Sequence, residues 1–250
     1  MEERMAVPPA ERPVTGAPTG DPPAQGSLPF SEPRALPILS TEHWSLLAGR
    51  SLVYNEAFSR AGMFLTFLSA SLIALGLMSG AMGFSTEFLT ITVLILALDL
   101  FIGLATMGRV STATDEDIRY LQGMNRIRHA YHEAVGGLEP YFIAGQYDDV
   151  AGIFGVSSED VQFRSRRSII HGFTTVVGMV GVINAAIAGV LVATIVLLVG
   201  SGVAAVVAGV VTFTIALVVA VYWLTRATAS TVEALEVKFP TPAARDRPAG

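Results

Sequence analysis

The strongest constraint on this chain is the stretch from Ser168 to Thr225, which contains no Asp, Glu, Lys or Arg. A single membrane crossing takes about 20 apolar residues, so this stretch is too long for one crossing. Gly200-Ser201-Gly202 interrupts it near the middle, and these residue types favour a turn. The stretch therefore predicts two apolar helices joined by a turn too tight to hold a domain.

A second pair of apolar segments precedes this stretch, and no charged residue other than Asp99 lies between Glu87 and Arg109. These two spans are expected over 61–83 and 88–108, with a short polar turn between them. All sixteen Lys and Arg residues lie outside the four spans and outside both turns. By the positive-inside rule, both termini and the central polar region are expected in the cytoplasm. The four spans are expected in the plasma membrane.

The composition agrees with a membrane protein, because 52% of the residues are hydrophobic and only 15% are charged. Soluble domains carry about a quarter charged residues. A net charge of −5 gives no reason to expect nucleic-acid binding. The absence of cysteine excludes disulfides, thiolate catalysis and cysteine-based metal sites. The predicted fold class is an all-α membrane protein with four transmembrane helices, arranged as two antiparallel hairpins with a cytoplasmic helical region between them and disordered termini.

Six segments are expected along the chain. They are a disordered proline-rich tail (1–37), an amphipathic cytoplasmic helix (38–60), a first transmembrane hairpin (61–83 and 88–108), a cytoplasmic helical region (109–171), a second transmembrane hairpin (172–199 and 203–225) and a C-terminal tail (226–250), disordered from Phe239 onward.

The amphipathic helix is expected to begin at the N-cap residues Ser40 and Thr41. Its apolar stripe recurs at three-to-four spacing in Trp44, Leu47, Ser51, Tyr54 and Phe58, with Leu46, Val53 and Ala57 beside it. Such a stripe either lies on the membrane surface or packs on the other cytoplasmic helices. Packing is the interpretation that we favour.

In the central region, Thr114 followed by Asp117 predicts the start of a new helix. Its apolar face would be Ile118, Leu121, Met124, Ile127, Tyr131 and Val135, and its solvated face Arg119, Gln122, Arg126, His129 and Glu133. His129, His132 and Glu133 share a helix face, but their spacing is not that of a known zinc motif, so an ordinary surface is expected. A short helix is predicted from Pro140 to Gln146, followed by a loop with one helical turn.

Lines of small residues at i, i+4 spacing run along three of the spans, and such lines let helix backbones approach closely in lipid. They are Gly62, Thr66, Ala70 and Ala74 in the first span; Gly181, Ala185, Gly189 and Ala193 in the third; and Ala204, Ala208, Thr212, Ala216 and Ala220 in the fourth. The third and fourth spans are therefore expected to pack on each other.

Two runs carry a resemblance to known proteins. They are 54–60, Tyr-Asn-Glu-Ala-Phe-Ser-Arg, and the set made of 126–131, 138–142 and 147–149. In these runs the chain resembles uncharacterised bacterial four-span integral membrane proteins, over roughly residues 40 to 230, which implies no particular activity. The layout alone is loosely similar to the SLATT-type membrane effectors thought to form pores.

Asp99 is the one carboxylate inside a predicted span, and Asn184 is the polar residue at similar depth in the third span. Burying a charge there costs at least about 2.5 kcal/mol, so a partner is expected. The favoured interpretation is a hydrogen bond between Asp99 and Asn184 that clips the two hairpins together. The alternatives are a proton or cation site between helices, or a contact between Asp99 and a neighbouring subunit.

Arg164, Arg166 and Arg167 are expected at the lipid headgroups, either as topology signals in contact with anionic lipid or as a specific lipid site. No catalytic residue, metal or cofactor is predicted. The expected partners are the bilayer, anionic lipid, a second copy of the chain and a cytoplasmic protein. The predicted function is a non-enzymatic membrane scaffold or regulator acting through its cytoplasmic helices; the alternative is a small oligomeric channel, pore or ion-coupled carrier that uses Asp99.

Overall fold

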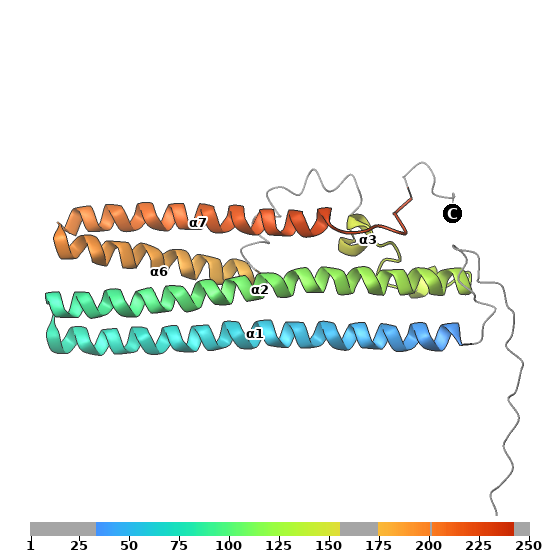
Figure 1. Ribbon diagram of the computed structural model, residues 1–250, viewed down its shortest axis with the longest axis horizontal. Coiled ribbons are helices and arrows are strands. Elements are labelled where there is room, and N and C mark those ends of the chain that lie inside the picture. The colour runs from blue at the N-terminus through green and yellow to red at the C-terminus, as the bar shows by residue number, and fades with distance from the viewer. Residues whose placement is uncertain (1–33, 156–174, 201, 243–250) are drawn as a thin grey trace, which may run out of the picture.

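The computed structural model describes residues 34–155, 175–200 and 202–242, and four long helices dominate it (Figure 1). These helices are α1 (Ala35–Met82), α2 (Thr86–Ala134), α6 (Val176–Val199) and α7 (Gly202–Glu233). Two short elements, η1 (Glu139–Tyr141) and α3 (Val150–Phe154), follow α2. The described residues contain no strand. The all-helical class is confirmed, and so are four helices that are long and apolar enough to cross a membrane.

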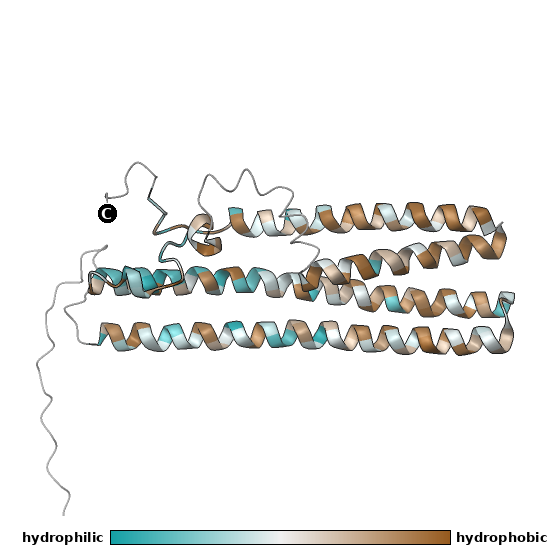
Figure 2. Cartoon of the chain, turned by 180° about the vertical axis from the view of Figure 1, so that it is seen from behind, coloured by the Kyte–Doolittle hydropathy of each residue, from teal (hydrophilic) through white to brown (hydrophobic). Residues whose placement is uncertain are grey.

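The four long helices lie in a row in the order α1, α2, α6 and α7 (Figures 1 and 2). The helix α2 packs along both α1 and α6, and α6 packs along α7, whereas α2 and α7 make few contacts with each other. Gly83, whose φ of 62° suits a residue without a side chain, ends α1. Ser85 caps α2 by accepting a hydrogen bond from the Phe88 N–H. Three residues thus reverse the chain between α1 and α2.

The helices α1 and α2 are each continuous, which corrects the predicted division of both. They contain 48 and 49 residues, so each is about 72 Å long at 1.5 Å per residue, against a hydrocarbon core of about 30 Å. Thr41 and Thr114, expected as helix starts, lie inside the helices and donate hydrogen bonds to Pro37 O and Val110 O. Threonine suits a cap, but its hydroxyl also bonds back to the preceding turn of a helix that continues.

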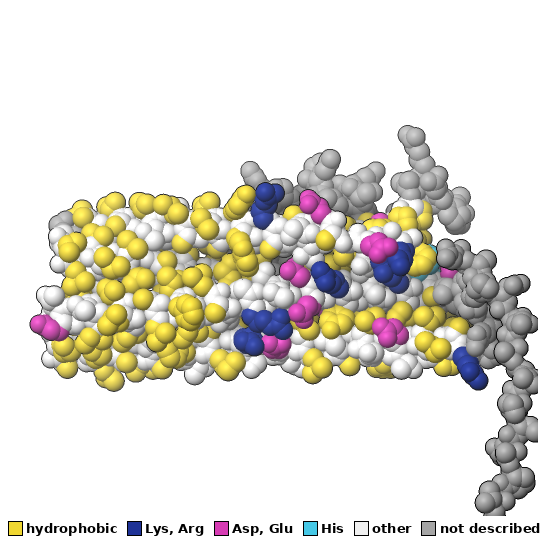
Figure 3. Space-filling model, in the orientation of Figure 1, with side chains coloured by type: hydrophobic (Ala, Val, Ile, Leu, Met, Phe, Trp, Pro, Cys, Tyr) yellow, Lys and Arg dark blue, Asp and Glu magenta, His cyan; other side chains and the backbone are white. Residues whose placement is uncertain are grey.

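Charge divides the molecule into two halves along its length (Figure 3). We use the name apolar half for residues 61–82 of α1 and 86–108 of α2, together with the parts of α6 and α7 beside them. The polar half comprises residues 35–60 of α1 and 109–134 of α2, with the loop and the C-terminal segment that lie against them. Lys, Arg, Asp and Glu gather over the polar half, and yellow apolar side chains cover the other.

Several predicted boundaries shift. The helix α1 begins at Ala35 rather than 38, because Pro37 falls in its first turn, where the missing N–H costs little. The helix α7 continues to Glu233, past the predicted end at 225. The predicted helix from Pro140 to Gln146 is reduced to the turn η1, while α3 confirms the predicted helical turn. Residues 1–33, 156–174 and 243–250, which include most of the predicted tails and the helix leading into the third span, lie outside the described residues.

Small residues bring α6 and α7 into close contact, as predicted. A Cβ added at Gly189 would lie 2.8 Å from Gly209 O, and one added at Gly209 would lie 2.9 Å from the Ala193 Cβ. The contact line on α7 departs from the predicted one near its start, where Ala205 and Gly209 are buried, whereas Ala220 of the predicted line faces Gly181 of α6. Ala205 and Gly209 are shifted by one residue from the predicted line, because Gly209 admits the backbone of α6 more closely than the neighbouring alanine could.

We expect Gly189→Ala to lower the stability of the protein by about 1–3 kcal/mol, because the added methyl group would overlap the backbone of α7. Gly76→Ala is the matched control, since a Cβ at Gly76 meets no atom within 4 Å. The measurement is reversible unfolding of both variants in the same detergent. Equal stability of the two variants would contradict the close α6–α7 contact.

Candidate functional site

Asp99 is fully buried in the apolar half of α2. Its Oδ1 accepts a hydrogen bond of 3.0 Å from the Ser71 hydroxyl of α1, and its Oδ2 has no partner among the described residues. The predicted hydrogen bond to Asn184 is therefore wrong. Asp99 links α1 to α2 within the first helix pair instead of clipping α2 to α6.

Asn184 lies where α6 faces α2 and is only 4% exposed. Its side chain packs over Gly103, because a Cβ at Gly103 would come within 1.9 Å of Asn184 Oδ1. Gly103 follows Asp99 by one helical turn, which is about 6 Å along the axis and too far for a hydrogen bond. Counting residues gave the two polar groups similar depths, but it could not show that the amide lies one turn away from the carboxylate.

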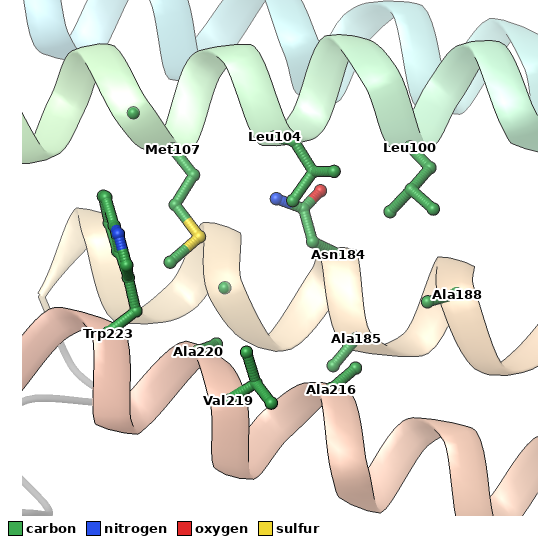
Figure 4. A pocket seen from close by; sticks show the side chains of 12 residues that line it. Leu100, Leu104, Met107, Asn184, Ala185, Ala188, Ala216, Val219, Ala220 and Trp223 are labelled. Carbon is green, nitrogen blue, oxygen red and sulfur yellow. The ribbon is translucent and has the colours of Figure 1, made fainter.

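A cleft of ≈ 410 Å³ opens beside Asn184, over α6 and between α2 and α7 (Figure 4). Leucine, methionine, alanine, valine and glycine make up most of its wall, and Trp223 closes one end. Neither amide atom of Asn184 has a hydrogen-bond partner among the described residues. Asp99 is not among the residues that line this cleft. The arginines at 164, 166 and 167 lie outside the described residues.

The predicted aromatic stripe of α1 is not the face that packs on α2. Val53 and Ala57, which lie beside the stripe, are buried instead. Trp44, Tyr54 and Phe58 are 66%, 43% and 59% exposed. The packing expected of the stripe is thus wrong, because the small and β-branched residues beside it let the two helices approach more closely than aromatic rings would. The alternative, that the stripe lies on the membrane surface, stays a prediction, although this part of α1 continues the apolar half as one helix.

Ion pairs hold the polar halves of α1 and α2 together. Arg50 Nε lies 2.5 Å from Asp117 Oδ1, and the Tyr54 hydroxyl donates to Asp117 Oδ2 at 3.0 Å. Nearer the apolar half, Arg109 binds Glu56 of α1 with two nitrogens, at 2.8 and 3.1 Å. Hydrogen bonds from Arg109 and then from Arg60 lower the pKa of Glu56 to about 2. The charged network fixes the rotation of α1, with Tyr54 at the edge of the contact and Trp44 and Phe58 turned outward.

A segment after α7, residues 236–241, is bound across the polar half of α2 by Asp148. The Asp148 carboxylate is fully buried and accepts hydrogen bonds from the backbone N–H groups of Lys238 and Phe239, at 2.7 to 3.1 Å. Arg126 Nε donates to the same carboxylate at 2.8 Å. The N–H of Asp148 in turn donates to Phe239 O at 3.1 Å. We call this arrangement the C-terminal clamp.

Residues of the predicted solvated face of α2 complete the clamp. Gln122 Nε2 donates to Asp148 O and to Glu236 O, at 3.1 and 3.0 Å. Arg126 donates to Glu236 O, and the His129 ring stacks on Phe239 with centroids 4.1 Å apart. The prediction that Gln122, Arg126 and His129 face solvent is therefore wrong. The acidic pair 148–149 in a loop was the one feature of the sequence that could have pointed to the clamp. It does not indicate which backbone groups the carboxylates bind.

The pKa of Asp148 reflects this balance of interactions. Burial alone would raise the pKa, but the N–H of Lys238, the Arg126 guanidinium and the N–H of Phe239 outweigh burial and lower it below the ordinary 3.8. A lowered folded-state pKa stabilises the clamp above pH 3.8, and this contribution is lost as the pH falls through the folded value. At neutral pH the Asp148 carboxylate is thus ionised and the clamp is closed.

Comparisons of the chain with protein-family models, with curated proteins and with solved structures found no match.

We expect a double-mutant cycle to couple Asp99 with Ser71 and not with Asn184. The changes are Asp99→Leu, Ser71→Ala and Asn184→Leu, alone and in pairs, with unfolding free energy in detergent as the readout. The Asp99–Ser71 coupling should be about 0.6–1.7 kcal/mol, as for other hydrogen bonds between membrane helices. Asp99 and Asn184 should be additive within about 0.5 kcal/mol. If Asp99 couples with Asn184 and not with Ser71, the hydrogen-bond partner assigned to Asp99 is wrong.

We expect Asp148→Asn to open the C-terminal clamp, because an uncharged amide cannot accept several N–H bonds and also neutralise Arg126. Hydrogen exchange at residues 236–241 should accelerate by about tenfold or more at pH 7, and the wild type should show the same loss only as the pH falls below 3.8. Glu139→Gln, an exposed acid of the neighbouring turn, is the matched control. Unchanged protection in Asp148→Asn would show that the carboxylate does not hold the segment.

Proposed function

We propose that this chain is a multi-pass protein of the plasma membrane with two transmembrane hairpins, α1–α2 and α6–α7. The apolar half would lie in the bilayer, and the polar half and both termini in the cytoplasm. The distribution of charge supports this orientation, because all sixteen basic residues lie outside the apolar segments and their turns. A length of about 33 Å for residues 61–82 fits the hydrocarbon core, so the remaining part of α1 would project as a stalk about 39 Å long.

We further propose that the protein is a non-enzymatic membrane scaffold that self-associates through the projecting part of α1. The observation that carries this proposal is the exposure of its aromatic stripe. Trp44, Leu47, Ser51, Tyr54 and Phe58 alternate steps of three and four residues, which is the heptad spacing of a coiled-coil seam. A monomeric surface rarely displays such a row of aromatic side chains in water, and patches of this kind mark interaction sites.

A second copy of this chain is the partner that fits the stripe best. Two parallel copies anchored in one membrane would bring the same stripe to the same height, so that each residue meets its equivalent across a two-fold axis. Gly62 follows the stripe by one turn, is exposed, and would let the two α1 helices stay close as they enter the bilayer. The contacts with α2 leave most of this surface open, since Glu56 binds Arg109 on the opposite side of α1 and, of the stripe residues, it is Tyr54 whose hydroxyl bonds to α2.

A channel or carrier built on Asp99 has less support, because the carboxylate is buried against Ser71 and does not line the cleft. The resemblance to four-span bacterial proteins and to pore-forming effectors stays a prediction. Contact of Arg164, Arg166 and Arg167 with anionic lipid also stays a prediction, and a cytoplasmic protein that binds the assembled stalk would be the next partner to seek.

We expect Ser51→Cys to form disulfide-linked dimers on mild oxidation in membranes, because Ser51 lies at the centre of the stripe. The chain has no native cysteine, so each variant reports one position. Ser45→Cys, exposed on another side of the same helix, is the control and should stay monomeric on reducing-agent-free gels. Equal cross-linking at both positions would indicate random collision and contradict the stripe as the interface.

The same interface should weaken when the aromatic side chains are removed. Trp44→Gln combined with Phe58→Gln should raise the dissociation constant in nanodiscs or detergent by about tenfold or more, as expected for buried aromatic anchors. Leu52→Gln removes an apolar side chain that is 70% exposed but lies off the stripe, and it should leave the stoichiometry unchanged. Dimers that survive the double change would refute self-association through α1.

The proposed orientation is tested separately by a membrane-impermeant thiol reagent. A cysteine at Thr86, at the α1–α2 turn, should react in intact cells, whereas one at Ser45 should react only after the membrane is opened. The opposite pattern would invert the topology without affecting the proposed dimer.

A further inference from the structure

The C-terminal clamp binds both the N–H and the C=O groups of residues 236–241. Two neighbouring carboxylates, those of Asp148 and Asp149, accept from the N–H groups at positions 238, 239 and 241, at 2.7 to 3.1 Å. The position between these donors is Pro240, which has no N–H to offer. The C=O groups at positions 236 and 239 accept from side chains of α2 and from the loop that follows it. The clamp therefore recognises this stretch mainly as a peptide backbone.

Two side chains of the segment add specificity. The Phe239 ring stacks on His129, and the Thr241 hydroxyl donates to Asp149 Oδ1 at 2.7 Å. The residues at 236, 237, 238 and 240 are exposed, so their side chains are free to vary. The sequence that the clamp selects is thus an aromatic residue, then proline, then threonine, with a non-helical backbone on both sides.

The part of the clamp that holds the segment is organised around a buried charge. We use the name receiving surface for Gln122, Arg126 and His129 of α2 together with Asp148 and Asp149. Without the segment, Arg126 would be the one partner that the Asp148 carboxylate keeps among the described residues. A carboxylate in a buried position with few partners is unfavourable. Any segment that supplies two adjacent N–H groups would restore the lost hydrogen bonds, so the receiving surface has an affinity for peptide backbone.

The segment can leave without disturbing the packing of the long helices. It follows α7 after the two residues 234 and 235, and it lies against the polar half of α2 (Figure 1). The contact that holds α7 to α6, between Gly209 and Gly189, lies in the apolar half. Release of residues 236–241 would therefore uncover the receiving surface and leave the helix row intact.

We propose that the receiving surface is a peptide-binding site for a separate cytoplasmic protein, and that residues 236–241 occupy it in cis. The partner would present a segment with the aromatic–proline–threonine sequence found at 239–241. This inference rests on the cytoplasmic location proposed for the polar half and names the kind of partner that binds there. It does not depend on self-association through α1.

The segment in cis competes with any partner. A short flexible tether gives a bound segment an effective concentration in the millimolar range. A partner with a single copy of the sequence would therefore bind weakly while the clamp is closed and much more tightly once the clamp is open.

The test measures binding of a fluorescein-labelled peptide of residues 234–242 to the full-length protein in nanodiscs, by fluorescence anisotropy at pH 7. An unlatched variant carries Lys238→Pro and Phe239→Ala, which remove one N–H and the aromatic ring from the segment in cis. The receiving surface is unchanged in this variant. The peptide should bind the unlatched variant saturably, with a dissociation constant at least about tenfold lower than for the wild type, where the tethered segment competes.

Changes in the peptide itself show which contacts are used. A peptide with alanine in place of Phe239 should bind the unlatched variant about fivefold more weakly, because it loses the aromatic contact with His129. A peptide with serine in place of the exposed Val237 is the matched control and should bind as tightly as the original. These changes leave the protein untouched, so the comparison does not depend on the folding of any further variant.

Asp148→Asn in the unlatched variant should raise the dissociation constant about tenfold or more, because the amide is uncharged. The proposal would be overturned by the absence of saturable binding to the unlatched variant, by equal binding of the alanine peptide, or by binding that survives Asp148→Asn. If a second copy supplied the segment, wild-type chains in the same nanodisc would displace the peptide, and that result would overturn the assignment to a separate protein. A nanodisc exposes both membrane faces, so an inverted topology or a failure of self-association would not change these results.

Discussion

The structure depends on one constraint, which is that hydrocarbon offers no hydrogen-bond partner to a peptide group. Each backbone N–H and C=O in the apolar half must therefore be paired within a helix. Once α1 and α2 are committed to helix in this way, nothing in residues 109–114 or around Arg60 interrupts them, because neither region contains proline. The helical register set by the apolar half is thus passed unbroken into the polar half.

The helix α6 connects the α1–α2 pair to α7. It lies between α2 and α7, and it meets them in different ways. Toward α7 it presents Gly189, which allows backbone contact with Gly209. Toward α2 it presents Asn184, whose amide is accommodated only because position 103 is a glycine. One side of α6 is therefore closed by small residues, and the other holds the unpaired amide of Asn184 against Gly103.

Much of the fold could be predicted from the sequence, because the signals involved are local. Long uncharged segments and the glycines between them gave the four apolar helices. Interactions that depend on rotation about a helix axis could not be predicted in this way. Large aromatic residues dominated the predicted stripe of α1, yet Val53 and Ala57 allow closer packing and are the residues buried. Counting residues placed Asp99 and Asn184 at similar depth, but one helical turn separates the amide from the carboxylate.

The C-terminal clamp could not be predicted for a different reason. Asp148 binds backbone N–H groups about ninety positions away, at Lys238 and Phe239, and backbone groups carry no sequence signature. The polar face of α2 was therefore predicted to be solvated, although Gln122 and Arg126 hold residues 236–241 and the loop that contains Asp148. The clamp lies on α2 and the aromatic stripe on α1, so the clamp leaves the stripe exposed.

The continuity of α1 through the membrane boundary is the claim on which the stalk depends, and a distance across that boundary tests it directly. Spin labels at Ser51→Cys and Ala70→Cys, diluted with unlabelled protein in nanodiscs, report this distance by pulsed dipolar spectroscopy. A continuous helix places the two backbones about 28 Å apart, at 1.5 Å for each of the intervening steps, with a narrow distribution. A shorter or broad distribution would mean that the helix breaks near Arg60 and that the projecting part of α1 is a separate element.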